Sequence, residues 1–294
     1  MSSSDPARVV LAIDGGNIKT DVALVDVDGR LLSLVRGGTS SPHALGFDRC
    51  VSVLSELVSE ACANVGLGSD SCAEVARILL AGADLPEEVE LLQNALSARG
   101  WASQLVVEND TLALLRTGTD RGWGVAVVCG GGINAVGIAP DGRTVRFPAL
   151  GAITGDWGGG HDVGVAALGA ASRSADGRGP RSTLERAVPH HFGLSTPLEV
   201  ARAFHFKEIS AEALAQLSPV VYEQAAVDAA AAAILERVAD EVALLAKAAL
   251  QRLDLCDAGA EVVLGGGLLR AAPPWMIERI EEQLRAVSAS ATVV

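Results

Sequence analysis

The apolar positions at the start of the chain follow a strand-like pattern that is interrupted by glycine. Residues 9–13 are apolar and mostly β-branched, and they end at the sequence Asp-Gly-Gly of residues 14–16. After Thr20 the apolar sequence resumes as two short runs that are joined at Asp28-Gly29. An Asp-Gly pair between two apolar runs is typical of a β-hairpin turn. The pattern therefore predicts a strand, a glycine turn and then a hairpin.

Residues 46–118 alternate between helical and strand-like spacing. Apolar residues recur every three or four positions in residues 46–66, which predicts a helix that ends at Gly66. We expect a strand in residues 74–82 and a helix in residues 86–100, where acidic residues occupy the first turn. Residues 104–118 predict a strand, a turn and the start of a helix.

Residues 123–147 repeat the plan of the N-terminus. An apolar strand leads to a glycine turn, a second strand, an Asp-Gly turn and a third strand. The pair Gly15-Gly16 corresponds to Gly130-Gly131, and Asp28-Gly29 corresponds to Asp141-Gly142. A chance match between two glycine hairpins is the alternative, but the agreement of the second turn favours one duplicated unit.

The remaining pattern is mainly helical. We expect helices in residues 163–174 and 198–206, and a long alanine-rich helix from 225 to 253. A strand after this helix runs into a third glycine turn at residues 265–267. Residues 184–195 show no clear periodicity. The sequence thus predicts an α/β protein with two domains, residues 1–114 and 115–294, and a cleft between them.

Composition excludes several classes of function. About half of the residues are apolar and a fifth are charged, so the chain is globular. Its formal net charge of −13 and the lack of a basic run make nucleic acids and anionic membranes poor partners. The five cysteines are scattered and the N-terminus lacks a signal-peptide pattern, which predicts a cytoplasmic protein in a reducing compartment. No segment is long and apolar enough to span a bilayer.

The glycine turns are candidate phosphate-binding elements. A glycine turn after a strand leaves backbone N–H groups unobstructed, and such groups bind phosphate. Three turns suggest a polyphosphate, and the carboxylate of Asp14 beside the first could hold hydrated Mg²⁺. For any single turn, a purely steric role is the simpler explanation. The first turn does not match the P-loop motif G-x-x-x-x-G-K-[ST], nor the dinucleotide-binding motif G-x-G-x-x-G before a helix. Because a strand pattern continues after Thr20, a hairpin would hold the phosphate.

Five segments carry a resemblance to a known family: residues 12–30 (AIDGGNIKTDVALVDVDGR), 107–115 (VENDTLALL), 128–143 (VCGGGINAVGIAPDGR), 149–164 (ALGAITGDWGGGHDVG) and 262–271 (VVLGGGLLRA). Together they resemble the BadF/BadG/BcrA/BcrD ATPase-type family, and within it the N-acetylglucosamine kinases and bacterial glucosamine kinases. The resemblance implies two ribonuclease H-like domains of the actin/hexokinase/Hsp70 type with an interdomain cleft. It also implies Mg²⁺- and ATP-dependent phosphorylation of an amino sugar at the 6-hydroxyl, by a homodimer.

The resemblance also implies roles for individual residues. Asp14 would lie near Mg²⁺, Asp110 would be the catalytic base, and Asp110, Gly131 and Asp156 would contact the sugar. The ATP-binding residues would be Gly15, Gly16, Asn17, Lys19, Thr20, Gly130, Gly131, Gly132, Asn134, Gly265, Gly266 and Gly267. Structural alternatives exist for both acids, because Asp110 precedes a predicted helix as an N-cap would and Asp156 precedes a glycine-rich turn.

The sequence departs from the family at a few places. Ile18 and Gly131 stand where a threonine or serine hydroxyl is usual. The resemblance also leads us to expect a final strand and a helix after residue 294, which either lie outside this sequence or are lacking in this member. Two other functions therefore stay open: a non-catalytic regulator that binds nucleotide or sugar, and an ATPase activator of an acyl-CoA dehydratase. The five histidines are expected to be packing or solvent-exposed residues.

Overall fold

The computed structural model describes residues 9–294. The chain divides into two compact units, Met1–Ala113 and Leu114–Val294, and the boundary lies within helix α4 (Thr111–Gly118). Each unit contains one five-stranded mixed sheet.

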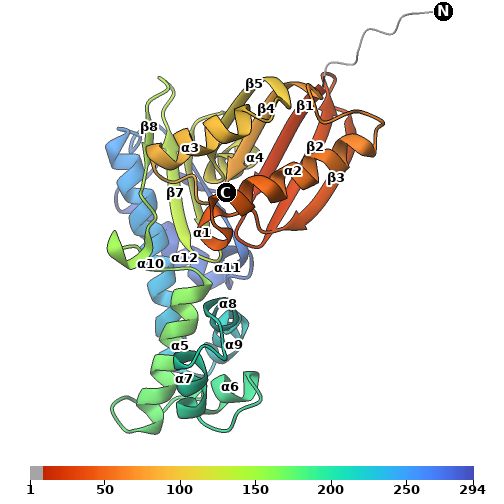
Figure 1. The fold of residues 1–294 in the computed structure, drawn as a ribbon. Helices are drawn as coiled ribbons and strands as arrows, with labels where there is room; N and C mark the ends of the chain where they lie inside the picture. The colour runs from red at the N-terminus through yellow and green to blue at the C-terminus, as the bar shows by residue number, and fades with distance from the viewer. Residues whose placement is uncertain (1–8) are drawn as a thin grey trace, which may run out of the picture. The chain divides into compact units, whose positions relative to one another are not determined.

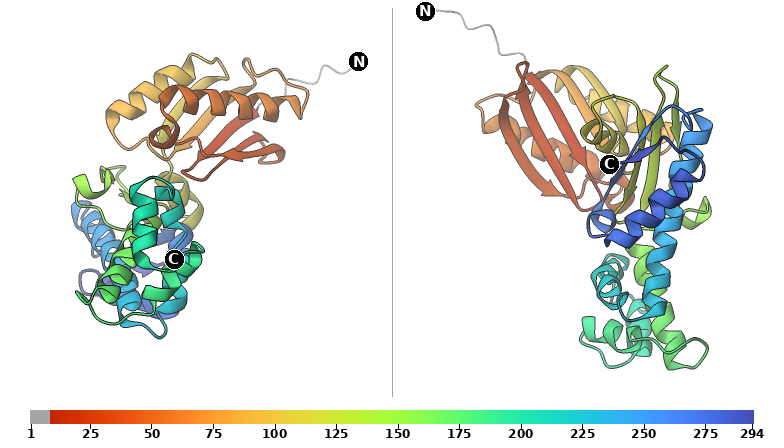
Figure 2. Two further views of the ribbon diagram at one scale, coloured as in Figure 1. Left: turned by 60° about the horizontal axis from the view of Figure 1, so that its bottom comes forward. Right: turned by 180° about the vertical axis from the view of Figure 1, so that it is seen from behind.

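The sheet of the first unit has the strand order β3-β2-β1-β4-β5. Strands β1 to β3 are antiparallel, whereas β4 pairs with β1 and β5 in parallel. Helices α2 and α3 lie on one face of this sheet (Figures 1 and 2), where apolar side chains of α2 form the core with those of the central strands. The elements are β1 (Val9–Gly15), β2 (Lys19–Asp26), β3 (Leu31–Gly38), α1 (Pro42–Leu45), α2 (Phe47–Ala63), β4 (Ala73–Leu80), α3 (Pro86–Ser97) and β5 (Ala102–Asn109).

The sheet of the second unit repeats this topology. Its order is β10-β9-β6-β7-β8, in which β6, β7 and β8 take the places of β1, β2 and β3. Strand β9 pairs with β6 in parallel, as β4 does with β1. The internal repeat that the two glycine hairpins predict is thus confirmed, and it extends over all five strands. These strands are β6 (Gly124–Cys129), β7 (Ile133–Ile138), β8 (Thr144–Arg146), β9 (Glu261–Gly265) and β10 (Thr292–Val293).

Helices make up the rest of the second unit. The long helix α10 packs on β6 and β7 and also contacts α5, α9 and α12 (Figure 1). Alanines and larger apolar residues fill its buried side. The elements are the 3₁₀ turn η1 (Gly151–Ile153), α5 (Gly160–Ala175), α6 (Leu184–His191), α7 (Pro197–His205), α8 (Ala211–Ala215), α9 (Ser218–Gln224), α10 (Ala229–Arg252), α11 (Gly267–Arg270) and α12 (Pro274–Arg285). No helix within residues 9–294 is both long and apolar enough to cross a bilayer.

One expectation from the sequence is wrong in detail, and one segment for which the sequence predicts no element is a helix. The alanine-rich helix begins at Ala229 and not at residue 225, because Asp228 is extended and its side chain caps the first turn. Residues 184–191, which show no clear periodicity, form helix α6 with Pro189 inside it. A helix of eight residues is too short for its spacing to stand out, and the proline conceals it.

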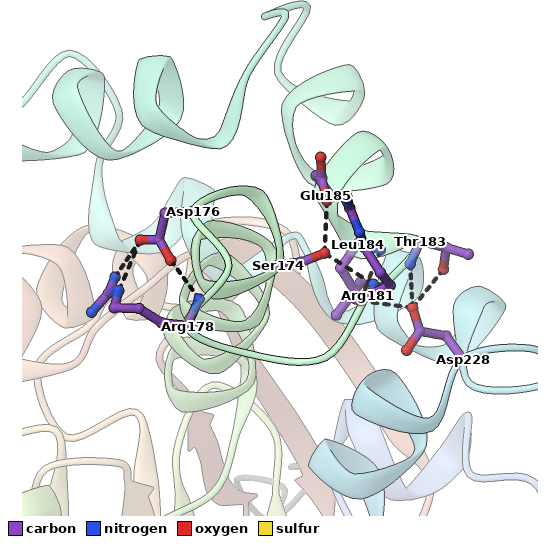
Figure 3. Close-up of polar contacts among 9 residues, drawn as sticks. Ser174, Asp176, Arg178, Arg181, Thr183, Leu184, Glu185 and Asp228 are labelled. Atoms are coloured by element: carbon purple, nitrogen blue, oxygen red, sulfur yellow. Dashed lines mark hydrogen bonds and ion pairs between the residues drawn. The ribbon is translucent and has the colours of Figure 1, made fainter.

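Asp228 joins two distant segments of the second unit (Figure 3). Its carboxylate accepts hydrogen bonds from the hydroxyls of Ser182 (2.7 Å) and Thr183 (2.8 Å) and from the backbone N–H of Thr183. It also accepts from the backbone N–H groups of Ala230 (2.8 Å) and Ala231 (3.3 Å) at the start of α10. Burial raises the pKa of this carboxyl, but the hydrogen bonds outweigh burial and lower the pKa to about 2. The ionised carboxylate therefore stabilises both the start of α10 and the segment before α6.

We expect Asp228→Ala to lower the free energy of unfolding of the second unit by about 2 kcal/mol at pH 7. The pKa of Asp228 is lower in the folded state than in the unfolded state. The stabilisation is therefore present above about pH 4 and is lost as the pH falls through about 2. Urea unfolding of the wild type, Asp228→Ala and the exposed control Asp120→Ala would test this. A difference between wild type and Asp228→Ala that stayed constant down to pH 2 would contradict it.

Candidate functional site

Three acidic residues of the first unit lie at or just after the ends of strands, at the same edge of the sheet. Asp14 is near the end of β1, Asp84 lies in the loop after β4, and Asp110 follows β5. The strand register pairs Gly15 with Leu80, and Leu80 with Asn109. Because β1, β4 and β5 are parallel, their carboxyl ends meet at one edge, where ligands bind in open α/β sheets.

The turn between β1 and β2 presents backbone donors. The N–H of Gly16 donates to the carbonyl of Lys19 (2.8 Å), which closes the turn. The N–H groups of Asn17 and Ile18 have no hydrogen-bond partner in the part of the chain that the structure describes. The side chain of Ile18 is 80% exposed, so it is not a core residue of the unit. Free N–H groups at an exposed turn fit a phosphate group.

Lys19 and Thr20, which flank this turn, already have partners. The ammonium of Lys19 lies 2.5 Å from Asp21 Oδ2, and Arg36 also pairs with Asp21 (2.6 Å). The hydrogen bond from Arg36 is the main reason that the pKa of Asp21 falls to about 2. The hydroxyl of Thr20 is buried and donates to Ser40 Oγ (2.8 Å). Thr20 therefore supports the turn from within the unit, whereas the Lys19 ammonium lies at its surface.

Asp110 is held at the junction of β5 and α4. Its backbone N–H donates to the carbonyl of Leu80 (3.3 Å). The neighbouring Asn109 is buried, and its Oδ1 accepts hydrogen bonds from the N–H (3.0 Å) and hydroxyl (2.5 Å) of Thr111. The Nδ2 of Asn109 donates to Asp84 Oδ1 (2.7 Å). Asn109 thus caps the start of α4 and links it to the loop after β4, which fixes the backbone of Asp110.

The environment of Asp110 favours its protonated form. Burial raises its pKa most, the negative charges of Asp14 and Asp84 raise it further, and the pKa reaches about 7 although the N–H of Thr111 opposes the shift. Burial also raises the pKa of Asp14, which Lys19 lowers. A carboxylate with a pKa near 7 can accept a proton at neutral pH. Asp14 is open to solvent although neighbouring atoms partly desolvate its carboxyl. Its carboxylate suits Mg²⁺, which binds through one or two carboxylates, phosphate oxygens and water.

Three glycine segments of the second unit lie against one another. Gly266 has φ +95°, and a Cβ there would lie 2.3 Å from the carbonyl oxygen of Cys129 at the end of β6. Gly159 has φ +85°, and a Cβ there would lie 2.4 Å from the Cα of Gly132. Any side chain at either position would push the segments apart. The turns at 130–132 and 265–267 and the glycines before α5 therefore approach one another backbone to backbone.

These glycine segments also present backbone donors. The N–H of Gly130 donates to Gly132 O (2.9 Å), and the N–H of Gly160 donates to Gly130 O (2.7 Å). Within residues 9–294, the N–H groups of Gly131, Gly132 and Gly267 have no protein acceptor. Such a cradle fits the phosphates of a nucleotide, and the predicted residues Gly130–Gly132 and Gly265–Gly267 lie together in it.

Asn134 and Asp156 flank this cradle in the chain. Asn134 lies in β7, and its Oδ1 accepts from the N–H of Ala135 (2.7 Å). Asp156 follows η1, is half-buried and accepts a hydrogen bond from the hydroxyl of Thr154. The next residue, Trp157, packs under the guanidinium of Arg237, 3.9 Å from the ring centroid. This cation–π contact ties the loop of Asp156 to α10.

Sequence reasoning missed several residues that hold these sites in place. Asn109 and Gly159 lie inside the segments that carry the resemblance, so the sequence places them near the candidate site residues but does not reveal their contacts. Asp84 and Arg237 lie outside those segments, and no local pattern marks them. The parallel pairing of β4 and β5 brings Asp84 close to Asn109, and the packing of α10 brings Arg237 close to Trp157.

Comparison with known proteins places this architecture in a family. The chain is 28% identical over 265 residues to the N-acetylmuramic acid/N-acetylglucosamine kinase of Clostridium acetobutylicum, covering 89% of this chain and 86% of that protein. It is 26% identical over 231 residues to the N-acetyl-D-glucosamine kinase of Dictyostelium discoideum, covering 74% and 71%. The crystal structure of a proposed N-acetylglucosamine kinase from Chromobacterium violaceum matches with a TM-score of 0.76 at 24% identity, covering 97% of this chain and all of that one (100%).

The structural match confirms the predicted fold class, the two-domain fold of the actin/hexokinase type. The model of the BadF/BadG/BcrA/BcrD ATPase family matches residues 11–293, which is nearly the whole chain. It spans both sheets, the three glycine turns and all the candidate site residues. The chain therefore belongs to the BadF/BadG/BcrA/BcrD ATPase family.

Proposed function

We propose that the protein is a sugar kinase that transfers the γ-phosphoryl group of ATP to the 6-hydroxyl of an amino sugar, N-acetylglucosamine or glucosamine. The names of the two curated relatives support an amino-sugar acceptor. The main support for the proposal is the environment of Asp110. A half-buried carboxylate with a pKa of about 7 stands at the carboxyl edge of the sheet, beside a hairpin with free backbone donors.

Asp110 is the proposed general base. A sugar hydroxyl is a poor nucleophile, so a base that takes its proton during attack on phosphorus accelerates transfer by about 10²–10⁴-fold. The ideal pKa of such a base lies near the working pH, and burial with Asp14 and Asp84 raises the pKa of Asp110 toward that value. Asn109 and Thr111 hold the base in place, since positioning is most of what a protein contributes to phosphoryl transfer.

The glycine segments are the proposed nucleotide site. In the first unit, residues 15–20 would hold ATP phosphates through the free N–H groups of Asn17 and Ile18, with Lys19 at the surface. In the second unit, the turn at 130–132 would hold phosphate, and the turn at 265–267 would lie against the adenosine. Asn134 would line this site, and Asp156 and Gly131 would contact the sugar. A Mg²⁺ ion at Asp14 would neutralise phosphate charge when bound.

The competing functions receive less support. An activator would hold its iron–sulfur cluster through Cys thiolates, but Cys50, Cys62, Cys72 and Cys129 are buried and Cys256 is half-buried. A non-catalytic regulator would not need a carboxylate whose pKa lies near neutrality. A homodimer remains part of the proposal on the family resemblance alone, and a cytoplasmic location on the cysteine and N-terminal patterns of the sequence.

The role of Asp110 predicts the effect of one substitution. Asp110→Asn keeps the shape of the side chain but cannot accept a proton, so turnover should fall by at least about a hundredfold while ATP affinity changes little. A coupled assay with N-acetylglucosamine and glucosamine, together with ATP titration calorimetry, measures both. The matched control is Asp120→Asn, an exposed loop aspartate. Near-normal turnover in Asp110→Asn would remove the residue from the mechanism.

The raised pKa of Asp110 predicts the pH dependence of the reaction. Only the ionised carboxylate accepts a proton, so kcat/KM should rise with pH through an acid limb. Without Mg²⁺ the carboxyl of Asp110 has a pKa of about 7. A cation beside Asp14 would offset part of the negative charge near Asp110 and so lower this pKa. The midpoint of the acid limb should therefore lie between 3.8 and about 7. The residual rate of Asp110→Asn should lack this limb. An identical limb in the variant would assign it to another group.

The exposed position of Ile18 predicts a gain of function. Its side chain lies at the turn whose N–H groups are free, so a hydroxyl there could donate to an ATP phosphate. Ile18→Thr should therefore tighten ATP binding or raise turnover, by up to about 1.5–3 kcal/mol if the bond is well aligned. Ile18→Val is the matched control, since valine has the shape of threonine without its hydroxyl. Equal kinetics for the two variants would show that position 18 does not reach phosphate.

A further inference from the structure

A histidine and two carboxylates of the first unit converge beside the candidate base. His43 comes from α1, Asp84 from the loop after β4, and Glu88 from the first turn of α3. One ligand atom from each of the three lies within 4.8 Å of the others. His43 Nε2 is 2.7 Å from Glu88 Oε1. The three residues are 45 positions apart at most, and the packing of α1 against the β4–α3 loop brings them together.

The carboxylates are held in place by other hydrogen bonds. Glu88 Oε2 accepts from the backbone N–H groups of Asp84 (3.0 Å) and Leu85 (2.9 Å), which leaves Oε1 directed at His43. Asp84 Oδ1 accepts from the buried amide of Asn109 (2.7 Å). Metal-binding carboxylates in proteins are fixed by outer hydrogen bonds of this kind. The cluster is therefore oriented before any ion binds.

The charge of the cluster favours a cation. Asp84 and Glu88 lie in a unit whose sheet edge also carries the carboxylates of Asp14 and Asp110, and Asp84 acts on Asp110 electrostatically. His43 is the basic group that faces this pair, and its imidazole is a strong ligand for first-row transition metals. Mg²⁺ prefers oxygen ligands alone, so a site with an imidazole differs in selectivity from the one proposed at Asp14.

From this geometry we propose that His43, Asp84 and Glu88 form a site for Zn²⁺ or a similar transition-metal ion, separate from the nucleotide site. His43 Nε2 and one oxygen from each carboxylate would bind the ion, with water in the open position. Zinc ligands lie about 2.0–2.2 Å from the ion, so small side-chain rotations would close the triangle of ligand atoms. His43 Nε2 must be unprotonated to bind, so its ring proton would reside on Nδ1. The ion would tie α1 to α3.

The proposal is tested by metal binding and does not depend on kinase activity. Metal-free protein is titrated with Zn²⁺ by calorimetry in excess Mg²⁺, and with Co²⁺ by visible absorption. The variants are His43→Gln and Glu88→Gln; the latter keeps an acceptor for the backbone N–H groups of Asp84 and Leu85. His191→Gln is the matched control, because His191 is an exposed histidine in the second unit.

We expect one Zn²⁺ per chain, a higher melting temperature with Zn²⁺, and binding at least about tenfold weaker in His43→Gln and Glu88→Gln than in wild type and His191→Gln. Co²⁺ should give ligand-field bands without the charge-transfer absorption of a thiolate ligand. Equal Zn²⁺ affinity in wild type and His43→Gln would overturn the proposal, as would a cobalt–thiolate spectrum or the absence of saturable binding. Melting temperatures in EDTA separate a lost ligand from a misfolded variant.

Discussion

Parallel pairing at the centre of each sheet is the constraint on which the sites depend. A parallel strand pair directs both carboxyl ends to one edge, so every loop that leaves those strands begins at the same place. In the first unit this brings together the ends of β1, β4 and β5, with Asp14, Asp84 and Asp110. In the second unit it brings the end of β6 beside the end of β9, where Val128 pairs with Gly265. The chemistry of each unit follows from which residues occupy that edge.

The two units use the repeated sheet in different ways. The edge of the first unit collects carboxylates, and the charges of Asp14 and Asp84 raise the pKa of Asp110. The edge of the second unit collects glycines, whose backbones approach too closely for any side chain. A cluster of acids suits proton transfer and metal binding, whereas a surface of backbone N–H groups suits an anion. The two sheets therefore share one topology but carry different residues at the corresponding edge.

Much of this architecture could be predicted from the sequence, because strands, glycine turns and Asp-Gly turns are local signals. The repeat was visible in residues 9–36 and 123–147, whereas the pattern did not assign any later strand to it. Helix α6 was missed because eight residues with an internal proline carry little periodicity, and the start of α10 depends on contacts of Asp228 with residues about 45 positions away. Asp84, His43 and Glu88 were missed for the same reason. Their significance comes from pairing across the sheet and from packing, which no local pattern records.

The central claim is that the chain transfers a phosphoryl group from ATP to the 6-hydroxyl of an amino sugar. Phosphorus NMR of a reaction with ATP, Mg²⁺ and N-acetylglucosamine or glucosamine tests it most directly, because the position of the new ester is read from its coupling to the sugar protons. The account predicts a phosphomonoester coupled to the two protons on carbon 6, formed in step with ADP. Orthophosphate and ADP without a new ester, an ester at carbon 1, or unchanged ATP with both sugars would contradict it.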